Sequence, residues 1–200
     1  MCRDTAVVDS EWKTCTTEDF CVEGSTLEYQ ADYSNSLSIH NWIEEYEMYC
    51  APKFQFGLFG SLFFIGVVLS SLIFPPLADK VGRRPIALIG VLMQALASVG
   101  LLFSTSLYFT YAMIFIMGMA MAPRFFVGYV FAMEFLPQKS TSMATSITLG
   151  VDGLVLMWSS LWFMMIDNHW KTLYGCAVVA TWFTILITYC MPESPKFLLS

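Results

Sequence analysis

Long runs with few or no charges fill the chain from residue 54 onwards, and short polar segments separate them. A hydrocarbon core of about 30 Å needs about 20 apolar residues in a helix. The run from Pro85 to Pro123 is too long for one span and divides at the polar residues 104–106. The pattern therefore predicts an all-α, polytopic transmembrane bundle of five helices, at residues 54–78, 85–103, 107–134, 142–166 and 172–191.

The first 52 residues follow a different pattern and predict a polar N-terminal arm. They hold 11 acidic residues and only two basic ones, Arg3 and Lys13, which gives a net charge of −9. The boundary between the arm (1–52) and the bundle (53–200) is expected near Cys50-Ala51-Pro52. The composition agrees with a membrane protein, because 56% of the residues are hydrophobic and 13% are charged, whereas about 25% are charged in soluble domains.

Lysine and arginine predict the orientation of the bundle, because short cytosolic loops collect them. The basic residues between and after the predicted spans fall mostly on one side: Lys80, Arg83, Arg84, Lys139 and Lys196. These loops are expected on the cytosolic or matrix side, and the arm on the external or lumenal side. The pattern leaves open whether the membrane is the plasma membrane or that of an organelle.

The arm contains an even set of cysteines, Cys2, Cys15, Cys21 and Cys50. On an oxidising side of the membrane they are expected to form disulfides, which would hold a segment with few apolar residues in shape. Four cysteines allow three pairings, which the sequence cannot separate, and free or metal-bound thiols remain the alternative. Two further cysteines, at positions 176 and 190, lie within the last span and are expected to be buried as small apolar residues.

Three motifs along the bundle share the spacing of a known family. Residues 75–85 read PPLADKVGRRP, residues 134–137 read EFLP, and residues 192–199 read PESPKFLL. The first resembles the loop signature of the major facilitator superfamily, G-x-x-x-D-[RK]-x-G-[RK]-[RK], between the second and third helices. The second resembles the E-x-x-P that ends the fourth helix. The third resembles the PESPRWL motif after the sixth helix of the sugar porter and organic ion transporter branches.

The acidic, cysteine-bearing arm resembles the large external loop of the organic ion transporter branch. That resemblance implies that the chain holds the second to sixth helices of the family and lacks the first helix and the second half. It also implies a gating signature, made of Asp79, Lys80, Gly82, Arg83, Arg84, Glu134, Glu193 and Lys196. The chain departs from the family at Pro75, which replaces the leading glycine, and at Ile114 and Thr141, which replace arginines of the cytosolic charge network.

The basic loop between the first two spans has two interpretations. Lys80, Arg83 and Arg84 could fix the topology and complement the negative end of a helix dipole. Alternatively, Asp79 and Arg83 could form a conformational latch with a second half. Gly82 would permit the tight turn in either case.

Two charges, Arg124 and Asp152, lie deep within predicted spans. Counted along two antiparallel helices, both lie about 20 Å from the basic side, and charges at such depth normally face the bundle interior, a cavity or each other. We expect an intramembrane ion pair, either purely structural or part of a substrate or proton site. For a solute, Asp152 could hold a cation and Arg124 an anion.

Two further patterns favour packing over a binding site. Trp158, Trp162 and Met165 share one face of the fourth predicted span and could bind an organic cation, but an interfacial aromatic belt or packing is the favoured interpretation. The small residues predict close contacts between helices: Gly57, Gly60, Ser61, Gly118 and Ala122.

Known catalytic and ligand motifs are missing from the sequence: there is no hydrolase elbow, phosphate loop, zinc motif or dinucleotide fingerprint. His40 and His169 are expected to be isolated in loops, and neither is assigned to a metal. The sequence therefore predicts a protein that is not an enzyme, with no cofactor, no metal and no nucleic-acid partner.

Two functions remain open. The first is transport of a small organic solute or ion by alternating access, with this chain as a partial or half unit that needs a second half. The second is an accessory or structural subunit of a larger membrane complex, derived from a transporter and without transport of its own. The expected partners are a lipid bilayer, a second transporter half or other membrane subunits, and a small organic solute.

Overall fold

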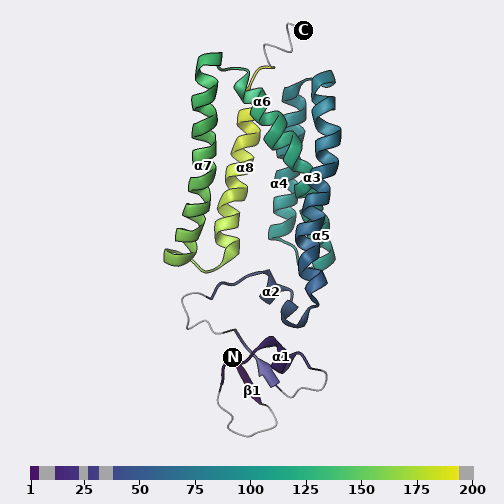
Figure 1. Ribbon diagram of the computed structural model, residues 1–200, viewed down its shortest axis with the longest axis vertical. Helices are drawn as coiled ribbons and strands as arrows, with labels where there is room; N and C mark the ends of the chain where they lie inside the picture. Colours follow the sequence, from purple (N-terminus) through teal and green to yellow (C-terminus); the bar gives the residue numbers. More distant parts are fainter. Residues whose placement is uncertain (5–11, 23–26, 32–37, 194–200) are drawn as a thin grey trace.

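The computed structural model describes residues 1–4, 12–22, 27–31 and 38–193. Within these residues, five helices are long and apolar enough to cross a membrane, which confirms the predicted helix bundle. They lie side by side, and the N-terminal arm extends from one end (Figure 1). We call this the arm end of the bundle, and the opposite end, where the basic signature loop lies, the basic end.

The membrane helices follow one another with short turns. Helix α3 covers Lys53–Val81, α4 Arg83–Leu102 and α5 Leu107–Met121. A π-helical segment, η2 at Ala122–Val127, joins α5 to α6 at Gly128–Met133. Helices α7 at Gln138–Met165 and α8 at Trp170–Cys190 complete the bundle.

Helix α3 ends abruptly at Gly82, where the signature loop turns the chain into α4. Gly82 has a φ of 109°, a backbone conformation that favours glycine. Its N–H donates to the backbone oxygen of Ala78 at 3.0 Å, which satisfies one of the last carbonyls of α3. Ala78 packs with Ile86 and Val127 in a small apolar core at the basic end.

Glycines bring α3 and α5 into direct backbone contact. A Cβ atom on Gly118 would lie 2.1 Å from the backbone oxygen of Phe63, and one on Gly66 would lie 2.5 Å from that of Phe115. The prediction of a close contact at Gly118 is confirmed. At Gly57 and Gly60 it is wrong, because a Cβ would meet nothing within 4 Å there. These helices are apolar on all sides, so the sequence does not reveal which face lies inside.

Helix α7 packs least of all the membrane helices. No residue in its most apolar stretch is buried, whereas 44% of the corresponding stretch of α4 is buried. Its contacts within the described chain include α8 and a hydrogen bond between Tyr129 and Thr145 at 2.5 Å. Figure 1 shows α7 at the outer edge of the bundle, beside α8.

The arm contains short elements tied by two disulfides. Strands β1, Cys2–Asp4, and β2, Leu27–Tyr29, form an antiparallel pair with Cys2 opposite Tyr29. Helix α1 covers Thr17–Phe20, α2 Trp42–Glu45, and a 3-10 turn, η1, Met48–Cys50. The structure pairs Cys2 with Cys15 and Cys21 with Cys50. The expected burial of the other two cysteines, at positions 176 and 190, is wrong, because both are exposed on α8.

Candidate functional site

The signature residues meet in a charge cluster at the basic end. Arg83, at the start of α4, forms an ion pair with Glu134, which directly follows α6. Both side chains are largely buried, with 20% of Arg83 and 10% of Glu134 exposed. The same guanidinium lies 3.6 Å from Asp79 in the last turns of α3. One arginine therefore holds the ends of three helical segments together.

Arg84 extends this cluster to the end of α8. Its backbone N–H donates to Oε1 of Glu193 at 3.1 Å, and its guanidinium donates to the backbone oxygen of Tyr189 at 2.5 Å. The guanidinium also lies 5.9 Å from the centre of the Tyr189 ring. Lys80 is exposed and Lys196 lies outside the described residues. The structure thus brings six of the eight predicted signature residues into one cluster: Asp79, Gly82, Arg83, Arg84, Glu134 and Glu193.

Arg124 is positioned by an irregular helix turn that the sequence analysis missed. It lies in η2 directly after Pro123, whose nitrogen cannot donate to the helix ladder. A Cβ on Gly90 of α4 would lie 2.5 Å from the backbone nitrogen of Arg124, so the two backbones touch there. Pro123 within an apolar run was the sequence signal, and π-helical turns often occur at functional sites.

Asp152 lies at the midpoint of the apolar span Lys139–Met165 on α7. Its carboxylate interacts electrostatically with Arg124. The ion pairs of the described residues, defined by contacts up to 4.0 Å, do not include these two side chains. Both residues are exposed, and the two charges interact at a distance longer than direct contact. The predicted direct ion pair stays a prediction.

Further polar side chains of the bundle interior escaped the sequence analysis. Nε2 of Gln94 donates to Oγ of Ser98 at 3.2 Å on α4, and Ser98 is buried. Tyr174 of α8 lies close by in the fold and directs its hydroxyl at the sulfur of Met117, 3.7 Å away. An amide in the middle of an uncharged run was the available signal for Gln94.

The aromatic stripe on α7 lies towards the arm end. The rings of Trp158 and Trp162 are 6.4 Å apart, and Met165 is 77% exposed. The indole N–H of Trp162 is buried without a hydrogen-bond partner among the described residues.

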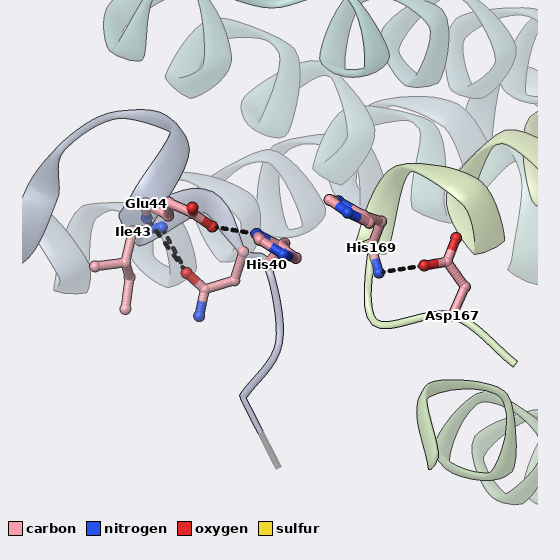
Figure 2. Close-up of polar contacts among 6 residues, drawn as sticks. His40, Ile43, Glu44, Asp167 and His169 are labelled. Carbon is pink, nitrogen blue, oxygen red and sulfur yellow. Dashed lines mark hydrogen bonds and ion pairs between the residues drawn. The ribbon is translucent and has the colours of Figure 1, made fainter. Parts of the chain in front are cut away.

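The arm contacts the arm end of the bundle on two sides. The hydroxyl of Tyr46 lies 2.6 Å from Oγ1 of Thr110, which in turn lies 2.7 Å from the hydroxyl of Ser104 in the turn between α4 and α5. On the other side, the ring of His40 stacks on the ring of His169 in the turn between α7 and α8 (Figure 2). The prediction that the two histidines are isolated is therefore wrong.

Comparison with known proteins identifies the family of this chain. The model of the family described as sugar (and other) transporter matches residues 16–200. A solute carrier family 22 member 15-like protein of Xenopus laevis is 28% identical over 97% of this chain. An organic cation transporter-like protein of Drosophila melanogaster is 30% identical over 84% of the chain, and human solute carrier family 22 member 2 is 28% identical over 79%.

The chain spans 38%, 29% and 28% of the lengths of these three relatives. The matched region nevertheless includes the whole helix bundle and the charge cluster at its basic end. The chain belongs to the sugar (and other) transporter family and, within the major facilitator superfamily, to the sugar porter and organic ion transporter branch.

Proposed function

We propose that this chain forms part of a carrier that moves a small organic solute or ion across a lipid bilayer by alternating access. Carriers of this architecture bind their solute near the middle of the bilayer, between two units that rock against each other. The relatives' names support transport, and that of the Drosophila relative, organic cation transporter-like protein, makes an organic cation the first class to test.

The observation that carries this proposal is the position of Asp152. A carboxylate at the midpoint of a membrane span is costly unless it faces protein, water or a cation. Here it lies on the helix with no buried residue in its apolar stretch. It interacts electrostatically with Arg124, but the ion pairs of the described residues do not include the two side chains. A water-filled solute site between this chain and further helices would supply the surroundings that Asp152 needs.

The charge cluster at the basic end provides a mechanism for opening and closing. The ion pair between Arg83 and Glu134 joins the turn between α3 and α4 to the end of α6, and Asp79 shares the same arginine. Closing a cavity on this side would use such a contact, and opening would break it or exchange its partners. We place this end on the cytosolic or matrix side because of its basic residues, and the arm on the opposite side.

The uncovered surface of α7 implies a protein partner in the membrane. We propose that a second transporter half covers it, as alternating access requires two units. Other membrane subunits would cover the same surface equally well. The uncovered surface of α7 therefore also supports the second candidate, an accessory subunit of a larger complex that does not transport.

One experiment separates the two candidates. The native protein is extracted in mild detergent, its mass and its co-purifying proteins are determined, and it is then reconstituted into proteoliposomes with radiolabelled tetraethylammonium as the probe. Saturable uptake that falls at least tenfold in Asp152→Asn supports the carrier. A 22.6 kDa chain held within a larger assembly that takes up no more label than protein-free vesicles supports the accessory subunit.

A further inference from the structure

The two histidines of the chain meet where the arm touches the turn between α7 and α8. Their ring centres are 4.0 Å apart and the ring planes differ by 1°, so the rings lie face to face (Figure 2). The backbone N–H of His40 also donates to the backbone oxygen of Asn168 at 3.1 Å. His40 and His169 are 129 positions apart in the sequence, so the contact joins two separate parts of the fold.

Charged groups surround this stack from both sides. On the arm, Nδ1 of His40 lies 2.7 Å from the carboxylate of Glu44, and Asn41 caps the first turn of α2 beside it. On the bundle, Asp167 accepts the backbone N–H of His169 at 3.0 Å, and Lys171 pairs with Glu45 across the contact. The hydroxyl of Thr172 donates to Asp167 and, together with the N–H of His169, lowers the pKa of that carboxyl.

Among the types of ionisable side chain at this contact, imidazole is the one whose ordinary pKa lies between 5.5 and 7.5. Carboxylates ordinarily titrate near pH 4 and lysine near pH 10, whereas imidazole titrates near pH 6.5. The pKa of Asp167 lies below its usual value, so Asp167 remains charged throughout this interval. Glu44 lies 2.7 Å from Nδ1 of His40, so a carboxylate faces the first proton that the stack takes up.

A second proton changes the balance. Two imidazolium rings held face to face repel each other, and the repulsion falls when the rings separate. The separated state therefore binds the second proton more readily than the stacked state. By linkage, a fall in pH shifts the equilibrium towards separation. We propose that the stack of His40 and His169 is a pH-sensitive clasp, which holds the arm on the turn between α7 and α8 near neutral pH and releases it when both rings are protonated.

Release would be local, because the arm has a second attachment. Tyr46 remains bonded to Thr110, and the ring of Trp42 contacts both Phe59 of α3 and Trp170 of α8, at 5.5 and 5.6 Å. Acid would open the contact at His169, while Tyr46 stays attached at the turn between α4 and α5 and Trp42 at α3 and the start of α8. The clasp does not depend on the proposed transport, since it rests on contacts between the arm and the turn between α7 and α8.

Hydrogen–deuterium exchange of the whole chain in lipid nanodiscs tests the clasp. The backbone amide of His40 reports directly on the bond to Asn168. Exchange times are scaled at each pH to cancel the intrinsic pH dependence of amide exchange. We expect protection at His40 to fall about tenfold between pH 7.5 and 5.5, the scale of repulsion between like charges at a partly exposed site, while the peptide over residues 104–111 keeps its protection.

Three variants make the test specific. His169→Phe keeps an aromatic ring without a titrating group and should retain protection at pH 5.5. His169→Lys carries a permanent charge in place of one ring and should lack protection at pH 5.5, because a proton on His40 alone then places two positive charges together. Lys171→Gln, the control, removes a charge that does not titrate in this interval and should change protection by the same factor at both pH values.

The proposal fails if protection at His40 in the wild type is independent of pH, or if His169→Phe loses protection on acidification as the wild type does. If His169→Phe is already unprotected at pH 7.5, the test rests on the pH dependence of protection in the wild type and in His169→Lys. Strong protection of the lysine variant at pH 5.5 then overturns the clasp.

Discussion

At the scale of single residues, the contact between α3 and α5 depends on having no side chain at Gly118. A Cβ there would lie 2.1 Å from the backbone oxygen of Phe63 and 3.2 Å from the Cα of Gly66. Neither of these atoms belongs to a flexible side chain, so the helices themselves would have to separate. The hydroxyl of Ser70, fully buried, also bonds to the oxygen of Gly118 at 3.4 Å and would move with it.

Gly118→Ala is therefore expected to lower the stability of the bundle by about 1–3 kcal/mol, as overpacking of a close contact does. The thermal unfolding midpoint of the detergent-solubilised protein measures this effect. Gly57→Ala is the matched control, since a Cβ at that position meets nothing within 4 Å and should leave the midpoint almost unchanged. Equal midpoints for the two variants would contradict the packing of α3 on α5.

The ion pair of Arg83 and Glu134 is a second test at this scale. Arg83→Gln leaves the carboxylate of Glu134, 10% exposed, without its cation. Loss of one partner of a buried pair costs about 3–5 kcal/mol, and partial exposure reduces this to about 2 kcal/mol. We expect a lower unfolding midpoint for the single variant and partial recovery in Arg83→Gln/Glu134→Gln, because the second change removes the unpaired charge.

The losses of stability in the two single variants give the loss expected for the double variant if the side chains act independently. A double variant that loses this full sum would contradict the ion pair. Lys80→Gln serves as the control. That side chain is exposed in the last turn of α3, so its removal should lower the stability very little.

At the scale of elements, the lengths of the helices could be predicted and their local irregularities could not. Uncharged runs of about 20 residues locate the spans because bilayer thickness sets their length. The π-helical turn at Ala122–Val127 leaves hydrophobicity unchanged, so a pattern based on polarity passes over it. Pro123 was a signal for it, since proline removes one helix hydrogen bond, but a proline alone does not say whether a helix ends, kinks or widens.

The arm is the element that depends most on covalent links. The bond between Cys21 and Cys50 joins residues 29 positions apart, and loop-closure entropy assigns such a link about 3–4 kcal/mol. Cys21→Ser/Cys50→Ser should make the arm sensitive to protease at neutral pH while leaving the unfolding midpoint of the bundle unchanged. The control is Cys176→Ser, which replaces an unpaired cysteine. An arm that resists protease equally well without the bond would contradict this role.

At the scale of the whole molecule, the site combines residues that sequence could indicate with contacts that it could not. Arg124 and Asp152 were visible as isolated charges in apolar runs, and Arg83 and Glu134 as parts of motifs. Their partners depend on how the helices pack side by side. The contact of His40 with His169 left no local pattern at all, because neither residue lies in a periodic segment and the turn between α7 and α8 approaches the arm only in the folded chain.

The interior charges give the prediction that bears most directly on function. Arg124 and Asp152 interact electrostatically, but the ion pairs of the described residues, with contacts up to 4.0 Å, do not include them. If they act as a structural couple, Asp152→Asn and Arg124→Gln each leave one charge unbalanced, and each should lower the unfolding midpoint. The charge swap Arg124→Asp/Asp152→Arg should then restore both the midpoint and uptake.

A solute site predicts a different result. Asp152→Asn should then reduce uptake of an organic cation at least tenfold with little change in stability, because the lost partner is the solute rather than Arg124. The charge swap would not rescue uptake, since the anionic group would move to the more irregular η2 segment, where the backbone is fixed against Gly90. Parallel measurement of the midpoint and of uptake in the three variants separates the two roles, and full uptake in every variant would exclude both. A site of the second kind would explain why a carboxylate lies at the midpoint of the least buried helix of the bundle.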